Sequence, residues 1–74
     1  MTMTICYLPN CDYGFDVEYK IKPDSYGDDD VYFEAAYIEG AELPVDTLFV
    51  GAVSFRNYFQ RELNEMFAKG KLVA

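Results

Sequence analysis

From residue 15 to residue 22 the chain alternates without a break between apolar and charged side chains. The odd positions are Phe15, Val17, Tyr19 and Ile21, and the even positions are Asp16, Glu18, Lys20 and Lys22. Neighbouring side chains on a strand point to opposite faces, so the pattern predicts a strand with one apolar face and one charged face. Pro23 has no N–H for a sheet ladder and ends this strand.

Two further apolar runs predict strands. Within residues 31–39, one face would carry Phe33, Ala35 and Tyr37, and the other Tyr32, Glu34, Ala36 and Ile38. Because both faces are largely apolar, this strand is either central in the sheet or meets a partner. The acidic loop 24–30 joins it to the preceding strand as an antiparallel hairpin. Residues 3–8 form a shorter run that ends at the turn signal Pro9-Asn10.

The last predicted element is an amphipathic helix over residues 54–69. Its apolar side chains Phe55, Phe59 and Leu63 recur every fourth residue, as one face of a helix requires. Ser54 is placed to cap the first turn, and Gly70 follows the helix after Lys69. Residues 42–51 fit either a turn or a brief strand.

Together these elements predict a single small acidic α+β domain over residues 1–74. Its architecture is a two- or three-stranded antiparallel sheet covered on one face by a single C-terminal amphipathic helix. A hairpin by itself is only marginally stable in water, and the helix supplies the apolar cover that it lacks. A chain of 74 residues leaves room for one domain.

The net charge of −7 narrows the range of partners. An acidic surface repels phosphate backbones and anionic lipids, so we expect neither direct nucleic-acid binding nor membrane binding. It attracts basic protein surfaces, although acidic charge also serves solubility alone. No apolar stretch reaches the ~20 residues of a membrane helix, and residues 1–8 lack a secretion signal, which predicts a cytoplasmic protein.

Side chains suited to catalysis are scarce. The chain has no histidine, so Ser25 and Ser54 lack a base, and it has neither a phosphate-binding loop nor a dinucleotide motif. We therefore predict no enzyme activity, no catalytic residues and no cofactor.

The cysteines and the acidic run of the loop predict no metal site. Asp28-Asp29-Asp30 does not match a calcium-binding loop, because Gly27 precedes the acidic run. Cys6 and Cys11 are expected to be free structural thiols in a reducing compartment, with a disulfide as the alternative in an oxidising one.

Charge is spread unevenly along the chain. Residues 1–54 hold eleven acidic side chains against two basic ones, whereas residues 55–74 hold two against four. The sheet and its loops should then form an acidic surface in which tyrosines act as anchors for a partner. The predicted partner-binding residues are Asp24, Tyr26, Asp28, Asp29, Asp30, Tyr32, Glu34, Glu39 and Glu42. A polar face that is merely solvated is the competing interpretation.

A strand at 17–23, an acidic loop, a strand end at 38–45 and an amphipathic helix follow one another within residues 14–68. This layout resembles small phage-encoded acidic accessory proteins of ββα type. The resemblance implies a small α+β fold and, as in some such proteins, inhibition of host enzymes or of anti-phage defence. Arg56 and Arg61 depart from a uniformly acidic helix, and the resemblance assigns no functional residues.

Two main functional hypotheses follow. The first is a non-catalytic protein-binding module, a phage-type inhibitor or modulator in the host cytoplasm. Its acidic surface, which can imitate the phosphates of a nucleic acid, would bind a basic surface of a host nucleic-acid-handling or defence protein. The alternative is a small structural or assembly protein that homodimerises through a strand face around Tyr32, Ala36 and Ile38. A carboxylate enzyme would need two carboxylates within reach of one pocket.

Overall fold

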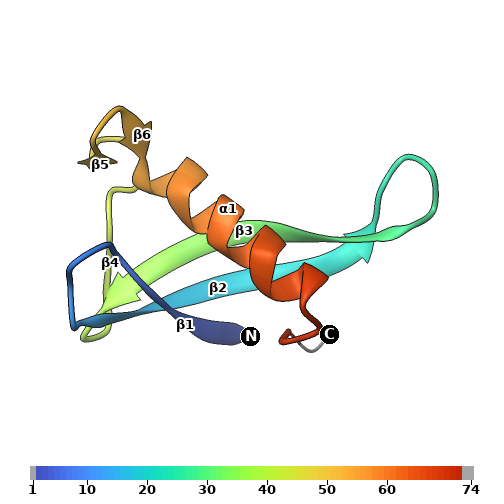
Figure 1. The fold of residues 1–74 in the computed structure, drawn as a ribbon, viewed down its shortest axis with the longest axis horizontal. Helices are drawn as coiled ribbons and strands as arrows, with labels where there is room; N and C mark the ends of the chain where they lie inside the picture. The colour runs from blue at the N-terminus through green and yellow to red at the C-terminus, as the bar shows by residue number, and fades with distance from the viewer. Residues whose placement is uncertain (1, 73–74) are drawn as a thin grey trace.

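Four strands form an antiparallel sheet in the order β1-β2-β3-β4, and one helix crosses a face of it in the computed structural model (Figure 1). The structure describes residues 2–72. The elements of the sheet and its cover are β1 (Met3–Tyr7), β2 (Gly14–Pro23), β3 (Asp29–Ile38), β4 (Ala41–Glu42) and α1 (Phe55–Ala68). A separate two-stranded sheet, β5 (Phe49–Val50) with β6 (Val53–Ser54), leads into the helix. The predicted α+β class is confirmed, but the main sheet has four strands rather than two or three.

The additional strand of the main sheet is the two-residue β4. A tight hairpin leads into it, since Ile38 pairs with Ala41 and only Glu39 and Gly40 lie between them. Both have positive φ, 50° and 83°, as the central pair of a type I′ turn requires. Two residues are too few to produce a readable alternation. For the same reason the sequence left residues 42–51 undecided, although β5 begins within them.

The two faces of β3 differ from the prediction because the strand contains a β-bulge. Glu18 of β2 lies opposite Ala35, but the next residue, Tyr19, lies opposite Phe33, so β3 has one extra residue here. The insertion moves Ala36, which is fully buried, onto the same face as Phe33, and Ile38 also packs against the core. The predicted grouping of Ala36 and Ile38 with Tyr32 was therefore wrong.

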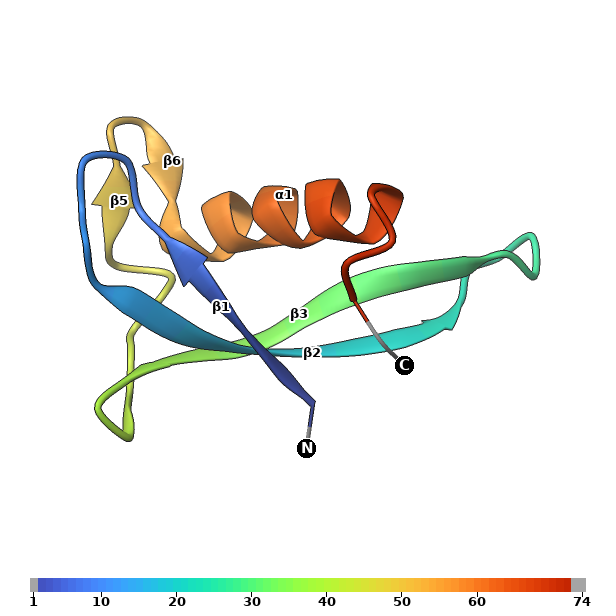
Figure 2. The same cartoon turned by 60° about the horizontal axis from the view of Figure 1, so that its bottom comes forward.

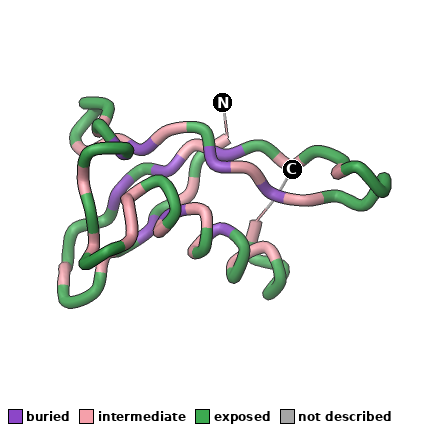
Figure 3. Tube along the Cα trace, turned by 90° about the horizontal axis from the view of Figure 1, so that it is seen from above, coloured by how far each residue is buried: buried purple, intermediate pink, exposed green. Residues whose placement is uncertain are grey.

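The core lies between the sheet and α1 (Figures 2 and 3). Phe59 and Leu63 of the helix are completely buried. The Phe59 ring stacks on Phe33 at a centroid distance of 6.1 Å and lies 5.7 Å from Phe15. Figure 2 shows α1 over one face of the sheet. No helix or strand of the described residues covers the opposite face, called the outer face below.

Both ends of α1 follow the sequence prediction closely. The Ser54 hydroxyl accepts a hydrogen bond from the Asn57 N–H at 3.3 Å, which satisfies one of the unpaired N–H groups of the first turn. Lys69 is the C-terminal cap, and Gly70 adopts the positive φ, 69°, that commonly follows a helix.

A glutamine of the helix bonds to the backbone of β3. The Gln60 Oε1 accepts the Phe33 N–H at 2.8 Å, and its Nε2 donates to the Val31 carbonyl at 2.9 Å. The second Nε2 hydrogen reaches the Asn64 Oδ1 at 3.0 Å. The side-chain amide thus bonds β3 as the backbone of a neighbouring strand would, on the edge that lies away from β2.

We expect Gln60→Glu to destabilise the fold by about 1–3 kcal/mol, because a carboxylate cannot donate to the Val31 carbonyl. Asn64→Asp is the matched control, since it adds the same charge to the same helix and keeps an acceptor for Gln60. It should cost no more than about 0.5 kcal/mol. Urea unfolding followed by circular dichroism measures both free energies, and equal losses would contradict the role given to Gln60.

Candidate functional site

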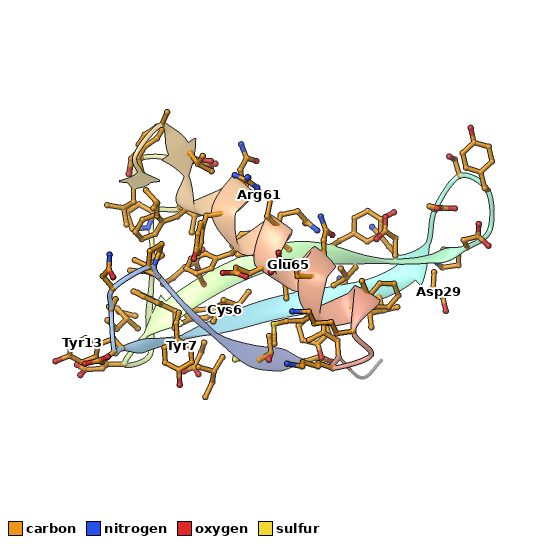
Figure 4. All side chains as sticks on the ribbon, viewed as in Figure 1. Cys6, Tyr7, Tyr13, Asp29, Arg61 and Glu65 are labelled. Carbon is orange, nitrogen blue, oxygen red and sulfur yellow. The ribbon has the colours of Figure 1, made fainter. Side chains whose placement is uncertain are left out.

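The predicted acidic surface is divided between the two ends of the molecule, whose longest dimension is 34 Å. Four of its aspartates and Tyr26 belong to the β2–β3 hairpin, whereas Glu39 and Glu42 lie beyond the far end of β3. Figure 4 shows Asp29 at one end of the molecule, and Figure 1 shows β4, which contains Glu42, near the other end. The nine predicted residues therefore do not form one continuous surface.

Two aspartates of the β2–β3 hairpin, Asp24 and Asp30, accept hydrogen bonds from nearby backbone N–H groups. The Asp24 Oδ1 accepts the N–H groups of Tyr26 and Asp28, at 2.8 and 3.1 Å, which is the local bonding that makes aspartate a turn residue. The Asp30 Oδ1 accepts the Val31 N–H at 2.8 Å. Asp28 and Asp29 are exposed, and Tyr26 is 90% exposed at the tip.

Opposite charges are matched on the outer face next to the hairpin. The Lys20 Nζ lies 3.6 Å from the Glu34 Oε1. Lys22 pairs across the strands with Asp30, and its Nζ lies 4.7 Å from the centre of the Tyr32 ring, a cation–π distance. The predicted anchor Tyr32 thus already contacts a cation of its own chain, and this half of the face has little net charge.

The other half of the outer face combines apolar and acidic side chains without a matching cation. In register across the sheet, Ile5 lies opposite Asp16, Asp16 opposite Tyr37, and Tyr37 opposite Glu42. Met3 lies opposite Glu18 in the next row on this face, and Tyr7 lies opposite Gly14. We call this set the outer-face patch: Met3, Ile5, Tyr7, Asp16, Glu18, Tyr37 and Glu42.

The apolar part of the patch is open to solvent. Ile5 and Tyr7 are each 53% exposed, and Met3 is 42% exposed. Gly14 leaves the space that the Ile5 side chain occupies, since a Cβ on Gly14 would lie 2.5 Å from the Ile5 Cγ2. Three large exposed side chains on one short strand form a contiguous apolar row of the kind found at interaction surfaces.

Two carboxylates of the outer-face patch, Glu18 and Glu42, affect the ionisation of Tyr37. Desolvation and the nearby negative charges of Glu18 and Glu42 raise the pKa of Tyr37, and its hydroxyl donates to the Glu18 Oε1 at 3.4 Å. Within residues 2–72, ion pairs join only Lys20 to Glu34 and Arg56 to Asp46. The three carboxylates of the patch therefore present uncompensated negative charge beside an apolar row.

Two shallow hollows lie on the surface of α1, and one of them also borders β1. One, of about 180 Å³, is lined by Ile5, Cys6, Tyr7, Glu62 and Met66. The other, of about 210 Å³, lies along the helix and is lined by Tyr58, Arg61, Glu62 and Glu65. The Tyr58 hydroxyl lies 2.9 Å from the Glu62 Oε1 and 3.1 Å from the Tyr7 carbonyl oxygen, and burial together with Glu62 raises the pKa of Tyr58 to about 12.

The Cys6 thiol ionises less readily than an ordinary cysteine. Cys6 and Cys11 are both free, and burial followed by the charge of Glu62 raises the pKa of Cys6 to about 11. In the described part of the chain, no three potential ligands among cysteine, aspartate and glutamate gather closely enough to hold a metal ion. Residues 2–72 also contain no helix with the length and apolar character needed to cross a membrane.

Comparison of the chain with protein-family models, with curated proteins and with solved structures gives no match. The geometry and charge of the surface therefore carry the functional argument.

The alternation along β2 predicted that its acidic side chains share one face, but it did not predict which neighbouring side chains complete the outer-face patch. Two signals for this connection were present, namely the apolar odd positions of the run at residues 3–8 and the alternation of β2. Two features could not be predicted from the sequence pattern. They are the strand register that sets Ile5 beside Asp16 and the bulge that turns Tyr37 to the same face.

Glu18→Gln should lower the pKa of Tyr37, because it removes one of the negative charges that disfavour the phenolate. Glu34→Gln removes the same charge from the Lys20 pair and should leave the Tyr37 titration unchanged. Ring resonances of Tyr37 followed by NMR in an alkaline titration measure the difference. Identical Tyr37 curves in the two variants would show that the cluster is not organised around this hydroxyl.

A thiol reagent such as DTNB at pH 8 should label Cys11 rapidly and Cys6 slowly. A thiol with a pKa of about 11 is thiolate in only about one molecule in a thousand at that pH. In a Cys11→Ser variant the rapid phase should disappear and the slow one remain. A rapid reaction of the remaining thiol would contradict the burial of Cys6.

Proposed function

We propose that this protein is a non-catalytic protein-binding module that engages a basic, partly apolar protein surface through the outer-face patch. The observation that carries the proposal is the row Ile5, Asp16, Tyr37 and Glu42, in which exposed apolar and uncompensated acidic side chains adjoin. A partner with lysine or arginine beside apolar side chains complements both parts of the patch.

Aromatic side chains strengthen the proposal. Tyrosine is enriched among the residues that dominate binding energy, since it offers a large apolar ring and a polar hydroxyl. Tyr7 supplies an exposed ring, and Tyr37 supplies a ring held by its bond to Glu18. Uncompensated carboxylates around them would speed the approach of a basic partner and favour it over an acidic one.

For the partner we keep the class expected from the sequence, the basic surface of a nucleic-acid-handling or defence protein of the host. A phage-type inhibitor or modulator would act in this way, by occupying a site that otherwise receives phosphates. The exposed hairpin residues Tyr26, Asp28 and Asp29 form a secondary candidate contact at the other end of the molecule.

The alternative homodimer cannot use the strand face first assigned to it. Of the three residues predicted for that face, Ala36 is fully buried and Ile38 packs against the core, while Tyr32 contacts Lys22.

The proposal is tested with the immobilised chain and a bacterial lysate at about 0.05 M and about 0.5 M salt, because screening weakens exposed charge pairs. Basic proteins should be retained at low salt and released at high salt. The double variant Asp16→Asn/Glu18→Gln should reduce their retention at least about tenfold, which corresponds to 1.4 kcal/mol.

The matched control is Asp28→Asn/Asp29→Asn, which removes the same two charges from the hairpin and should retain most of the binding. An equal loss in both double variants would mean that net charge, rather than the patch, drives retention. A lysate from which no protein is retained at low salt would also contradict the proposal.

A further inference from the structure

The two edges of the main sheet differ in how many of their backbone groups are hydrogen-bonded by the chain itself. On the β3 side, the Ala36 carbonyl accepts the Leu43 N–H at 2.8 Å beside β4, and Gln60 bonds the Phe33 N–H and the Val31 carbonyl. On the β1 side, the one comparable contact in the described residues is that of the Tyr58 hydroxyl with the Tyr7 carbonyl. One edge is thus occupied by the chain itself, and the other is left available.

The register of β1 shows which of its backbone groups are available. The Tyr19 N–H donates to the Thr2 carbonyl at 3.0 Å, so Thr2 and Tyr19 form a hydrogen-bonded pair of the antiparallel ladder. Such pairs alternate along the ladder, so Thr4 and Cys6 also bond to β2. The backbone groups of Met3, Ile5 and Tyr7 therefore point away from β2, toward the open edge.

This edge also lacks the charges that normally protect an edge strand. Residues 2–11 contain no charged side chain, although charged residues make up 26% of the chain. Natural sheets protect exposed edges with lysine, proline, bulges or covering elements, because an open edge is a template for another strand. An uncharged, open edge with three exposed apolar side chains is a surface suited to strand pairing.

We propose that a second copy of this chain pairs with β1, antiparallel and centred on Ile5. In this register Ile5 lies opposite Ile5 of the other copy, and Met3 lies opposite Tyr7, so all five residues of each β1 are paired. The outward backbone groups of Met3 and Ile5 then meet their counterparts, and the two sheets become one. The Tyr7 carbonyl already accepts the Tyr58 hydroxyl, so it would bond to the second copy through its other lone pair. A two-fold axis that passes between the two β1 strands, midway between the two Ile5 residues, generates this contact from a single sequence.

The charge distribution permits a second copy at this edge despite the net charge of −7 on each chain. In the paired sheet, Asp16 of one copy is separated from Asp16 of the other by the two β1 strands. This is three strand spacings, about 14 Å, and it exceeds the screening length of about 8 Å at physiological salt. The helix side of the edge carries both signs, with Arg61 beside Glu62 and Glu65.

The area of contact predicts a weak dimer. Five backbone residues and three half-exposed side chains from each copy bury less than the ~1,200 Å² typical of stable complexes. The dimer should therefore depend on concentration. The dimer is distinct from the proposed partner binding, because it uses the edge of β1. The outer faces of the two copies would lie side by side and stay exposed to solvent.

Cysteine crosslinking tests the register, in a Cys11→Ser background with Cys6 buried. Ile5→Cys should form a disulfide-linked dimer under mild oxidation, because opposite residues of a hydrogen-bonded pair have Cα atoms about 5.5 Å apart. Met3→Cys alone should not, since its copies lie about 13 Å apart. A mixture of Met3→Cys and Tyr7→Cys chains should crosslink.

Sedimentation equilibrium of the full chain tests the dimer without crosslinking. The dissociation constant should rise at least about tenfold in Ile5→Lys, where two ammonium groups meet at the centre of the pair. Phe49→Lys is the matched control, because Phe49 is 57% exposed on β5, away from β1, and its change should leave the dimer unaffected.

Three results would overturn the proposal. They are a chain that stays monomeric up to about millimolar concentration, a dimer that Ile5→Lys does not weaken, and equal crosslinking by Met3→Cys and Ile5→Cys alone. Protection of the Ile5 amide from hydrogen exchange only after adding a basic peptide would assign the edge to a foreign strand instead. Charge changes at Asp16 and Glu18 that abolish partner capture but preserve the dimer would separate the two proposals.

Discussion

The contact of Phe59 with Phe15 and Phe33 determines how the rest of the molecule is arranged. It attaches α1 to the two long strands at the centre of the sheet, and Leu63 one turn later continues the same buried row. Once this face is covered, the helix reaches both sides of the sheet: Gln60 bonds to β3, and Tyr58 contacts the end of β1. The helix therefore decides which face, and which parts of each edge, remain for other molecules.

The bulge in β3 determines which side chains of this strand face the core and which face the outer surface. A regular β3 would place Ala35 and Tyr37 toward the helix together with Phe33. The extra residue instead brings small Ala36 beneath α1 and turns Tyr37 to the outer face, between Asp16 and Glu42 in the sheet register. The tyrosine hydroxyl then finds Glu18 as its acceptor. One inserted residue thus allows close packing on one side of the sheet and creates an acidic, aromatic cluster on the other.

Sequence patterns predicted the elements whose periodicity is long and unbroken. β2, the hairpin and α1 with its Ser54 cap follow from alternation, turn residues and four-residue spacing, because each of these signals is local. β4 and β5 were too short to leave a pattern. The bulge in β3 is invisible to alternation, since Val31 to Ile38 is largely apolar on both faces. The candidate site depended on the register between strands. The sequence therefore indicated acidic side chains as a class, but it grouped hairpin residues such as Asp24 with the distant Glu42.

The outer face of the sheet and the edge of β1 both expose apolar side chains, but they differ in charge. Acidic side chains lie on β2, β3 and β4, whereas β1 carries none. The proposed basic partner would therefore be attracted to the face, where Asp16, Glu18 and Glu42 lie, and would gain nothing from charge along the edge of β1. At that edge, association depends on backbone hydrogen bonds and apolar contact, which a second copy provides as readily as any other strand. Because the face and the edge rely on different interactions, salt should weaken partner binding much more than pairing between copies.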